Sequence, residues 1–314
     1  MILRPPLPVW RSMMFVPANV ERYVEKAHTC GADAIIVDLE DSIAPAEKAA
    51  ARGLVQGVVA KVGRGGADVV VRINRPWRIA VSDIEAAVSL RVCALALPKV
   101  DDAAHIRVVA EIVDELEIER GIAVGSTRLI AMIETAEAFF EVRAIARAHP
   151  RVVATMLGME DFSVTMGMAP EPEGLLHATA QTAIAARAAG VVPLGLIGTL
   201  AQFSDREAFR TMVRRAKALG IEGSFCIHPG QVPILNEEFA PTAAEVAHAD
   251  RAIAAFDAAI TGGRASAELD GRMIDVPVAE RARRVLSRQA AIEARQRAMA
   301  AACDGQDRTK TQVV

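Results

Sequence analysis

Short apolar runs rich in β-branched residues alternate along this chain with longer stretches whose apolar residues recur at helical spacing. The intervals between the runs are too long for hairpins, so consecutive strands are expected to lie parallel, each followed by a helix. Eight such units in about 240 residues match a (β/α)8 TIM barrel, whose typical size is about 250 residues. An open doubly wound sheet is the alternative. The predicted strands are 13–16, 34–39, 69–73, 94–98, 129–133, 152–157, 193–197 and 225–227.

The composition agrees with a barrel and narrows the range of partners. Of the 314 residues, 52% are hydrophobic and only 4% aromatic, so aliphatic side chains must fill the core, as they do around buried parallel strands. The net charge of −3 provides no broad basic surface for nucleic acid. An anionic ligand must therefore be small and held by a local group of Arg and Lys.

The cysteines and the apolar segments bear on the compartment. The four cysteines lie far apart and form no CxxC pair, which argues against a zinc ribbon or a disulfide framework and favours a reducing cytoplasm. Pro5 and Pro6 interrupt what would have to be the apolar core of a signal peptide. The most apolar stretch, 191–201, is much shorter than the ~20 residues that span a bilayer. We therefore expect a cytoplasmic protein without membrane association.

The chain is expected to divide into a catalytic barrel, residues 1–240, and a C-terminal helical extension, residues 241–314. The extension begins with a helix to about residue 260, continues through a Gly-containing hinge and ends in a long helix of Ala, Arg and Glu. It is too short and too helical for a second core, and about the last ten residues, from Asp304, are expected to be disordered. Capping boxes predict helix starts at Ser82 with Glu85, Ser204 with Glu207, and Thr242 with Glu245.

Polar residues directly follow five of the predicted strands, and the strands of a barrel all end on one face. A charge at the end of a buried strand is costly unless it is paired or binds a ligand, so the repetition indicates a site. Glu134 and Asp161 end successive strands. Two carboxylates without a nearby Cys or His form a hard oxygen site, suited to Mg²⁺ rather than zinc. Alternatively, Glu134 caps its helix and Asp161 pairs with Arg72 or Lys99.

Basic residues at the same strand ends have the charge to hold carboxylates. Arg72 lies inside an apolar run, so its guanidinium must find a partner, whereas Arg75 is better explained as a solvated loop charge. His228 follows the eighth strand, where it either faces the site or is a hydrogen-bonded structural residue. Asp275 lies far beyond the barrel, and local rules explain it as a helix N-cap ahead of Pro277.

Taken in order, these motifs resemble the HpcH/HpaI aldolase and citrate lyase β-subunit family. The resemblance extends from about residue 10 to about residue 290, and although each motif is short, the ordered set is specific. The motifs are Arg11-Ser12-Met13-Met14-Phe15-Val16-Pro17-Ala18, Val37-Asp38-Leu39-Glu40-Asp41-Ser42 with Lys48 and Arg52, Val71-Arg72-Ile73-Asn74, Leu97-Pro98-Lys99, Ile133-Glu134-Thr135, Gly158-Met159-Glu160-Asp161, Ile227-His228-Pro229 and Met273-Ile274-Asp275-Val276-Pro277.

The resemblance implies a barrel with Mg²⁺ at the strand ends that cleaves or forms a carbon–carbon bond between an acyl thioester and a 2-oxo acid. It implies Glu134 and Asp161 as metal ligands, with Glu134 also at the substrate. It implies Arg72 as the catalytic cation beside the substrate carboxylate and the thioester oxygen, where it stabilises an enolate. Glu40 and Asp41 match acidic residues that line the same substrate pocket.

The resemblance also changes the interpretation of the C-terminal extension. In the malyl-CoA lyase branch, the residue matching Asp275 is a catalytic acid or base that a neighbouring subunit delivers within a trimer or hexamer. This implies a homo-oligomer, such as a homotrimer, in which residues 241–314 pack on a neighbouring subunit. The N-cap interpretation of Asp275 then gives way to a catalytic one.

The expected function is a Mg²⁺-dependent lyase that splits a 3-hydroxyacyl-CoA, such as malyl-CoA or citramalyl-CoA, into an acyl-CoA and a 2-oxo acid. The alternatives are a citryl-thioester lyase β subunit that works with an acyl-carrier protein, a class II-type aldolase without a thioester, and an inactive barrel subunit. Two departures near the predicted pocket rim leave the substrate and its carrier open. Residues 195–199 lack an acidic residue that many relatives carry, and Ser224 stands where a Lys often precedes Ile-His-Pro.

Overall fold

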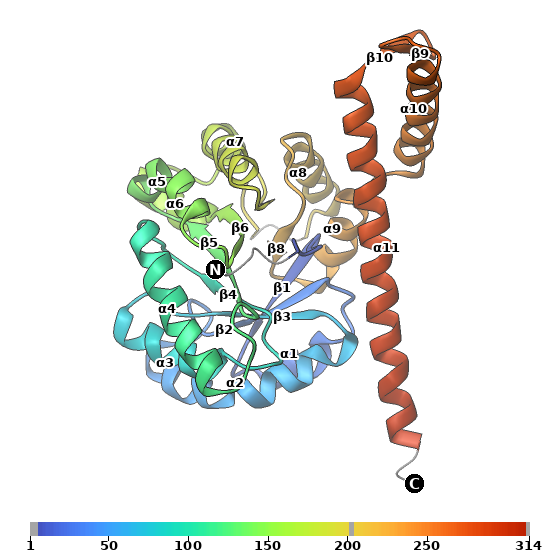
Figure 1. The fold of residues 1–314 in the computed structure, drawn as a ribbon. Coiled ribbons are helices and arrows are strands. Elements are labelled where there is room, and N and C mark those ends of the chain that lie inside the picture. Colours follow the sequence, from blue (N-terminus) through green and yellow to red (C-terminus); the bar gives the residue numbers. More distant parts are fainter. Residues whose placement is uncertain (1–5, 201–203, 312–314) are drawn as a thin grey trace. The chain divides into compact units, whose positions relative to one another are not determined.

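The computed structural model describes residues 6–200 and 204–311, with side chains as far as residue 303. Its centre is a parallel sheet of eight strands, in which β1 to β6 each pair with the next strand along the chain and β8 pairs with β1 (Figure 1). The strands are β1 (Ser12–Pro17), β2 (Ala34–Asp38), β3 (Asp68–Arg72), β4 (Ala94–Leu97), β5 (Arg128–Ile133), β6 (Val152–Leu157), β7 (Val192–Leu194) and β8 (Ser224–Cys226).

The two edges of this sheet meet at β7 and β8. Leu194 forms a bridge with Gly223, whose carbonyl oxygen accepts the Gly195 N–H at 2.9 Å. A Cβ atom at Gly223 would lie 1.7 Å from the carbonyl oxygen of Trp10, so only glycine fits at this contact. The (β/α)8 barrel is thus confirmed. The open doubly wound sheet is wrong, because such a sheet keeps two free edges and reverses its strand order.

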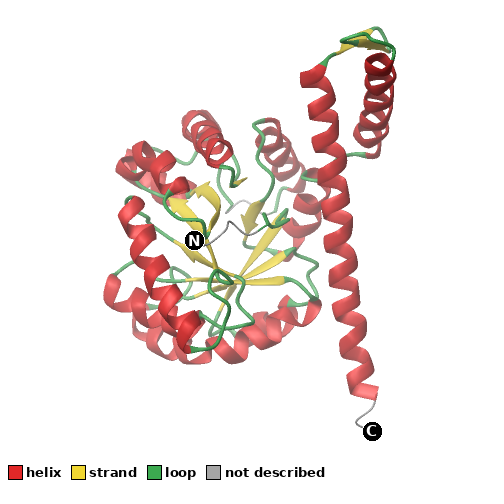
Figure 2. Cartoon of the chain, in the orientation of Figure 1, coloured by secondary structure: helices red, strands yellow, loops and turns green. Residues whose placement is uncertain are grey.

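Helices surround the strands on the outside of the barrel (Figure 2). None of the helices in the described residues is long and apolar enough to cross a membrane. The helices of the barrel are α1 (Glu21–Ala27), α2 (Lys48–Val62), α3 (Trp77–Ala87), α4 (Ala103–Glu119), α5 (Ala136–Arg147), α6 (Met159–Met166), α7 (Pro172–Ala189), α8 (Arg206–Ala218) and α9 (Val232–Glu238), with short 3-10 helices η1 (Pro45–Glu47), η2 (Gly63–Gly65) and η3 (Pro229–Gln231).

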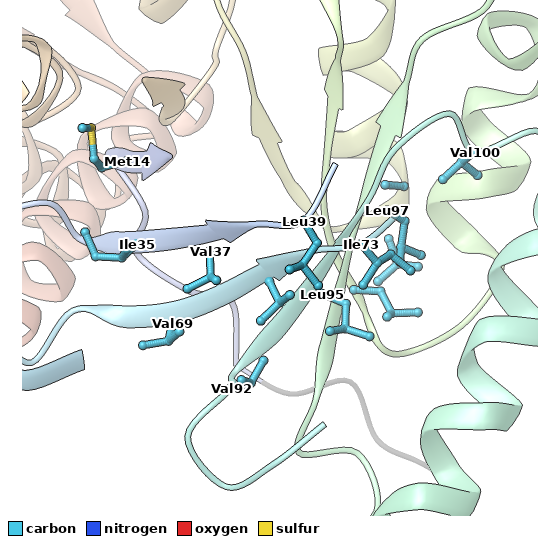
Figure 3. Close-up of a cluster of buried hydrophobic side chains, with 14 of the residues drawn as sticks. Met14, Ile35, Val37, Leu39, Val69, Ile73, Val92, Leu95, Leu97 and Val100 are labelled. Atoms are coloured by element: carbon cyan, nitrogen blue, oxygen red, sulfur yellow. The ribbon is translucent and has the colours of Figure 1, made fainter. Parts of the chain in front are cut away.

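Alternation along the strands divides the apolar core into two clusters. Residues such as Ile35 and Leu95 face outward and pack with apolar side chains of the helices (Figure 3). Ile36 points the other way and joins other strand residues that fill the barrel interior. Asp38 and Arg72 continue the inward-facing series at the C-terminal ends of β2 and β3. The barrel interior is therefore filled with apolar side chains, Trp10 and Phe225 among them, and becomes charged at the C-terminal ends of the strands.

One of the three predicted capping boxes is confirmed. Thr242 caps α10 (Ala243–Thr261) through the expected reciprocal hydrogen bonds. The prediction at Ser82 is wrong because α3 already begins at Trp77 and Ser82 lies inside it. The prediction at Ser204 is displaced by one residue, since Asp205 caps α8 with its carboxylate.

The predicted strands seven and eight are too long at their C-terminal ends. β7 ends at Leu194 because Gly195 and Gly198 take φ angles of 136° and 130°, which turn the chain out of the strand. β8 ends at Cys226 rather than at residue 227. Residues 195–199 therefore form a turn at the face where the strands end.

The chain divides into two compact units, Met1–Phe239 with Ala301–Val314, and Ala240–Ala300. The second unit contains α10, the hairpin of β9 (Ala267–Leu269) and β10 (Arg272–Ile274), and the first part of α11 (Val276–Thr311). It has a small apolar cluster of its own around Phe256, Ile274 and Ala279, so the expectation that this segment forms no core is wrong. The hairpin turns at Asp270-Gly271, a strong hairpin signal in the sequence. The end from Asp304, expected to be disordered, falls on residues whose side chains lie outside the described part of the chain.

Candidate active site

Asp38 and Arg72 lie opposite each other at the ends of β2 and β3, because the register of the parallel pair aligns them. Arg72 donates from Nε to Oδ1 and from Nη2 to Oδ2 of Asp38, both at 2.7 Å, and its guanidinium lies 4.6 Å from the ring centre of Phe15. Burial acts to raise the pKa of Asp38, but the hydrogen bonds and the charge of Arg72 outweigh it and lower the pKa. This two-point contact fixes the orientation of Arg72.

Glu40 and Asp41 follow β2 and lie near the remaining end of the guanidinium. Arg72 Nη1 is 2.8 Å from Glu40 Oε2 and 3.6 Å from Asp41 Oδ2. Lys99, which follows β4, donates from Nζ to Glu40 Oε1 at 2.8 Å. Burial raises the pKa of Glu40, although both cations oppose the shift. The structure thus brings both acidic residues to the same strand ends as Arg72.

Glu134 follows β5 directly, and its side chain is turned into the barrel mouth with 2% of its surface exposed. Its Oε2 accepts the backbone N–H of Lys99 at 2.5 Å. Burial, together with the charges of Glu40 and Asp161, raises the pKa of Glu134 to about 8, although the hydrogen bond and the charge of Lys99 oppose the shift. Glu134 does not cap its helix, because Thr135 caps α5 instead. That alternative is therefore wrong.

Asp161 lies in the first turn of α6, after β6, and its side chain is 39% exposed. Lys99 Nζ is 3.5 Å from Asp161 Oδ1. The alternative that Asp161 forms an ion pair with Lys99 is thus confirmed by this distance. It does not account for Glu134, which remains a buried carboxylate with an unfavourable charge environment.

The residues at these strand ends fit a hard divalent cation. Within the described residues, no group of three Asp, Glu, His or Cys side chains forms a ready-made metal cage. A Mg²⁺ site normally uses only one or two carboxylates, with water and substrate oxygens as the other ligands. Burial is the main cause of the raised pKa of Glu134, and the charges of Glu40 and Asp161 add to it; a bound cation would stabilise the carboxylate against both effects. Glu134 and Asp161 are therefore suitable as the two protein ligands.

A pocket of about 720 Å³ lies next to Asp38 and Arg72, and its walls come from β1, α1 and residues 227–229 after β8. Its walls are mostly apolar, and the charged residues among them are Lys26, Asp38, Arg72 and Glu160. His228 lines the pocket and is also structural, since its Nδ1 accepts the Gly230 N–H at 3.0 Å. Both interpretations of His228 therefore hold. The pocket can accept a long, largely apolar molecule whose reactive end reaches Arg72.

The two departures from the family pattern differ in their relation to this pocket. Thr199, in the turn after β7, donates from its hydroxyl to Glu160 Oε1, and Glu160 lines the pocket. Ser224 is buried as the first residue of β8, paired with Ser12. It therefore lies at the N-terminal end of its strand, and the expectation that it borders the pocket is wrong.

A network of four side chains, Lys48, Arg52, Asn74 and Asp83, links the segments that follow β2 and β3, and only Asp83 was absent from the sequence motifs. Lys48, at the start of α2, donates from Nζ to the carbonyl oxygen of Glu40 (2.8 Å) and to Asn74 Oδ1 (2.5 Å). Asn74 in turn donates to Asp83, which also pairs with Arg52. Lys48, Arg52 and Asn74 belong to the family motifs, and Lys48 and Arg52 are spaced four residues apart on one helix face, whereas no sequence signal indicated Asp83. The network ties the segments after β2 and β3 together.

Asp275 lies in the C-terminal unit, between β10 and α11. Its Oδ1 accepts the Val278 N–H at 3.2 Å, which is the N-cap contact expected from local rules. The neighbouring side chains of Met273 and Val276 are exposed apolar groups. The structure describes one chain, so the role of Asp275 toward another subunit stays a prediction.

Replacing Gly158 by alanine is expected to weaken metal binding. A Cβ atom at this position, between β6 and α6, would lie 2.3 Å from Cγ and 2.5 Å from Oε1 of Glu134, so the carboxylate must move. If Glu134 is a metal ligand, its displacement should cost at least the roughly 10–100-fold in affinity that loss of a ligand's supporting contact typically costs. Calorimetric titration with Mg²⁺ checks the result. Gly53→Ala is the matched control, since no atom lies within 4 Å of that Cβ position; equal affinities of the two variants would contradict the prediction.

Metal binding is also expected to depend on pH. Because the pKa of Glu134 is raised to about 8, its carboxyl group is protonated below that pH, and a cation must displace the proton. Affinity for Mg²⁺ should therefore rise with pH up to about 8 and level off above it, with release of a proton below it. Titrations in buffers of different ionisation enthalpy measure both effects. An affinity that is flat across this range in the parent protein would contradict the assignment.

The fold and the site together define a barrel enzyme with a charged, metal-competent centre at the C-terminal ends of its strands. The chain belongs to the HpcH/HpaI aldolase/citrate lyase family, whose model matches residues 11–229. The matched segment includes Arg72, Glu134 and Asp161 and nearly the whole barrel.

Characterised relatives resemble the chain over most of its length. The citrate lyase subunit beta of Leuconostoc mesenteroides subsp. cremoris is 36% identical over 281 residues, which is 88% of this chain and 92% of the relative. A (3S)-malyl-CoA thioesterase of Cereibacter sphaeroides is 34% identical over 290 residues, 91% of this chain and 96% of the relative. The crystal structure of CitE from Mycobacterium tuberculosis in complex with magnesium, acetoacetate and coenzyme A has a TM-score of 0.71 and 28% identity, covering 91% of this chain and 99% of that one.

Proposed function

We propose that this chain is a Mg²⁺-dependent carbon–carbon lyase that splits a 3-hydroxyacyl thioester into an acyl-CoA and a 2-oxo acid. The observation that carries the proposal is the buried carboxylate of Glu134, close to Glu40 and Asp161, at strand ends where Arg72 reaches a large apolar pocket. The magnesium and coenzyme A in the CitE complex support it, as does the citrate lyase relative.

The metal half of the site would hold the acid part of the substrate. Glu134 and Asp161 would bind Mg²⁺, which when bound polarises the oxygens of the acid as a Lewis acid. Lys99, with its ammonium between Glu40 and Asp161, would limit the repulsion between these carboxylates. The 2-oxo acid would therefore form at the strand ends of β5 and β6.

The pocket half of the site would hold the acyl thioester. Its mostly apolar walls suit an acyl chain and a thioester arm, and Arg72 lies at its charged end. As the hydroxyl group of the substrate loses its proton, its oxygen becomes the carbonyl oxygen of the 2-oxo acid, the carbon–carbon bond breaks, and the electron pair of that bond stays on the thioester fragment as an enolate. Arg72, held in one orientation by Asp38, would stabilise the enolate oxygen, a contribution of about 3 kcal/mol for a single well-placed donor.

Protonation of the enolate carbon would fall to Asp275 of a neighbouring subunit. Supporting this, Asp275 lies at the start of α11 next to exposed apolar side chains, Met273 and Val276, which a partner surface could cover. A closed homo-oligomer, a trimer or a hexamer, would give every site one such residue. In the condensation direction the same carboxylate would remove the proton.

We place the activity in the cytoplasm. Within the described residues none of the four cysteines forms a disulfide, which is what a reducing compartment maintains. The expected substrates, acyl thioesters and 2-oxo acids, are small anionic molecules that the local group of Arg72 and Lys99 suits.

A second candidate is hydrolysis of the same kind of thioester, because one relative at 34% identity is a malyl-CoA thioesterase. It differs from the lyase in its products: free coenzyme A and an intact hydroxy acid. The site residues would be shared, since both reactions place negative charge on the thioester oxygen.

An activity screen tests these proposals. The full chain is incubated with Mg²⁺ and malyl-CoA, citramalyl-CoA or a citryl thioester, and 2-oxo acid and free thiol are measured separately. The lyase gives 2-oxo acid without free thiol, and chelation of the metal abolishes it. Free thiol alone indicates hydrolysis. Turnover only with a carrier-bound citryl thioester indicates the citrate lyase β-subunit role, and the absence of any product indicates an inactive barrel.

A further inference from the structure

Lys99 has an unusual backbone conformation at the centre of the site. Among the described non-glycine residues, φ is positive at Lys99 (47°) and at Asp270 (51°). Asp270 lies in a hairpin turn, where this conformation is expected, whereas Lys99 follows the buried strand β4. A long side chain takes this conformation only when its surroundings hold it there.

The left-handed conformation allows Lys99 to make two kinds of contact at once. Its backbone N–H points at Glu134 Oε2, at 2.5 Å. Its ammonium group reaches Glu40 Oε1 at 2.8 Å and Asp161 Oδ1 at 3.5 Å. One residue thus contacts both of the proposed metal ligands, one through the main chain and one through the side chain.

Arg75 provides the contact that holds this corner. Its Nε donates to the carbonyl oxygen of Lys99 at 3.2 Å, and its Nη2 pairs with Asp101, two residues further along. The guanidinium lies 5.3 Å from the ring centre of Trp77, which packs at 4.8 Å against the ring of His105. The expectation of a solvated loop charge is therefore wrong for Arg75, whose guanidinium binds both the main chain of Lys99 and the carboxylate of Asp101.

We infer that Arg75 is a positioning residue: by clamping residues 99 and 101 it holds Lys99 in the left-handed conformation that aligns Glu134 and Asp161 for the metal. Arg75 itself contacts neither carboxylate and acts through Lys99. The fork of the guanidinium is essential, because one group must donate to a carbonyl oxygen and to a carboxylate at the same time. The part of this inference that concerns metal affinity rests on the proposed function, whereas the part that concerns the conformation of Lys99 does not.

A spectroscopic readout tests the structural part directly. The chain has six lysines, so selective ¹⁵N-lysine labelling gives six backbone amide signals, and Lys99→Arg identifies the one from Lys99. A short hydrogen bond to a carboxylate shifts that amide proton to low field. In Arg75→Gln the signal should move toward the random-coil position, while the other five signals stay in place and show that the fold is intact.

Metal affinity, measured by calorimetric titration with Mg²⁺, is the second readout. Arg75→Gln and Arg75→Lys should both raise Kd about 10–100-fold, as loss of support for a ligand typically does. Lysine retains the charge but not the fork, so an unchanged Kd in Arg75→Lys would show that only charge matters. Arg78→Gln, an exposed position on α3, is the control for the loss of one positive charge and should leave Kd unchanged.

The two proposals fail in different ways. If the parent protein binds no Mg²⁺, the proposed function is overturned, and the Lys99 amide signal still decides the role of Arg75. If Arg75→Gln leaves both that signal and Kd unchanged, the positioning role is overturned and the proposed lyase is unaffected.

Discussion

Replacing Glu134 by glutamine is expected to lower lyase turnover by about 10³-fold and to remove Mg²⁺ binding at this site. A bound divalent ion supplies several kcal/mol of charge stabilisation, and each 1.4 kcal/mol corresponds to about a factor of ten in rate. Glutamine keeps the volume of the side chain and an oxygen that can accept the Lys99 N–H, so only the charge is lost. Turnover of the proposed thioester substrates and calorimetric titration with Mg²⁺ measure the two effects.

The same substitution should not destabilise the metal-free protein. Burial, with the charges of Glu40 and Asp161 adding to it, raises the pKa of Glu134 and disfavours its charged form, so a neutral glutamine costs no stability at this position. A melting temperature equal to or above that of the parent is expected. Glu137→Gln, an exposed carboxylate three residues further along, is the matched control and should change neither property. Full activity in Glu134→Gln would exclude this residue as a metal ligand.

Replacing Asp275 by asparagine is expected to lower turnover by about 10²–10⁴-fold, the usual contribution of a general acid or base, with Mg²⁺ affinity unchanged. Mg²⁺ affinity should not change because Asp275 is not part of the proposed metal site. Asp275 belongs to the C-terminal unit, whereas the proposed metal ligands lie in the barrel unit. Asparagine can still accept the Val278 N–H at the start of α11, so the helix cap is retained. Kinetics and titration on the same preparation separate the two effects.

Mixing the two inactive variants decides whether Asp275 acts between subunits. If it acts in a neighbouring site, randomly mixed oligomers of Glu134→Gln and Asp275→Asn contain both intact residues in about one quarter of their sites, and activity returns to that level. If it acts within its own chain, no mixed site is complete and activity stays at background. Separate refolding of each variant before mixing, without subunit exchange, is the control.

The barrel could be predicted because its signals are local. A buried parallel strand needs a short run of β-branched and aliphatic residues, and the helix that follows needs a different periodicity, so eight alternations define the architecture. All eight strands were found near their predicted positions. The differences between the predicted and observed elements also have local causes. Gly195 ends β7 earlier than predicted, and the hairpin of β9 and β10 was not predicted although Asp270-Gly271 is a typical hairpin turn.

The list of candidate residues could also be drawn from the chain. Parallel strands of a barrel all end on one face, so polar residues after Asp38, Arg72, Leu97, Ile133 and Leu157 were expected to meet there. Glu40, Asp41, Arg72, Glu134 and Asp161 do lie around these ends, within the contacts described above. What each residue does there could not be deduced in the same way.

Only the tertiary structure decided how these residues pair. The register of β2 and β3 makes Asp38 the partner of Arg72, and the left-handed turn at Lys99 brings one residue against Glu134 and Asp161 together. The absence of a side chain at Gly158 leaves room for Glu134. These facts depend on distances of a few ångströms between segments that are far apart in sequence. The periodicity of the chain therefore determined which residues share a face, while burial and register determined the charge, the partner and the orientation of each one.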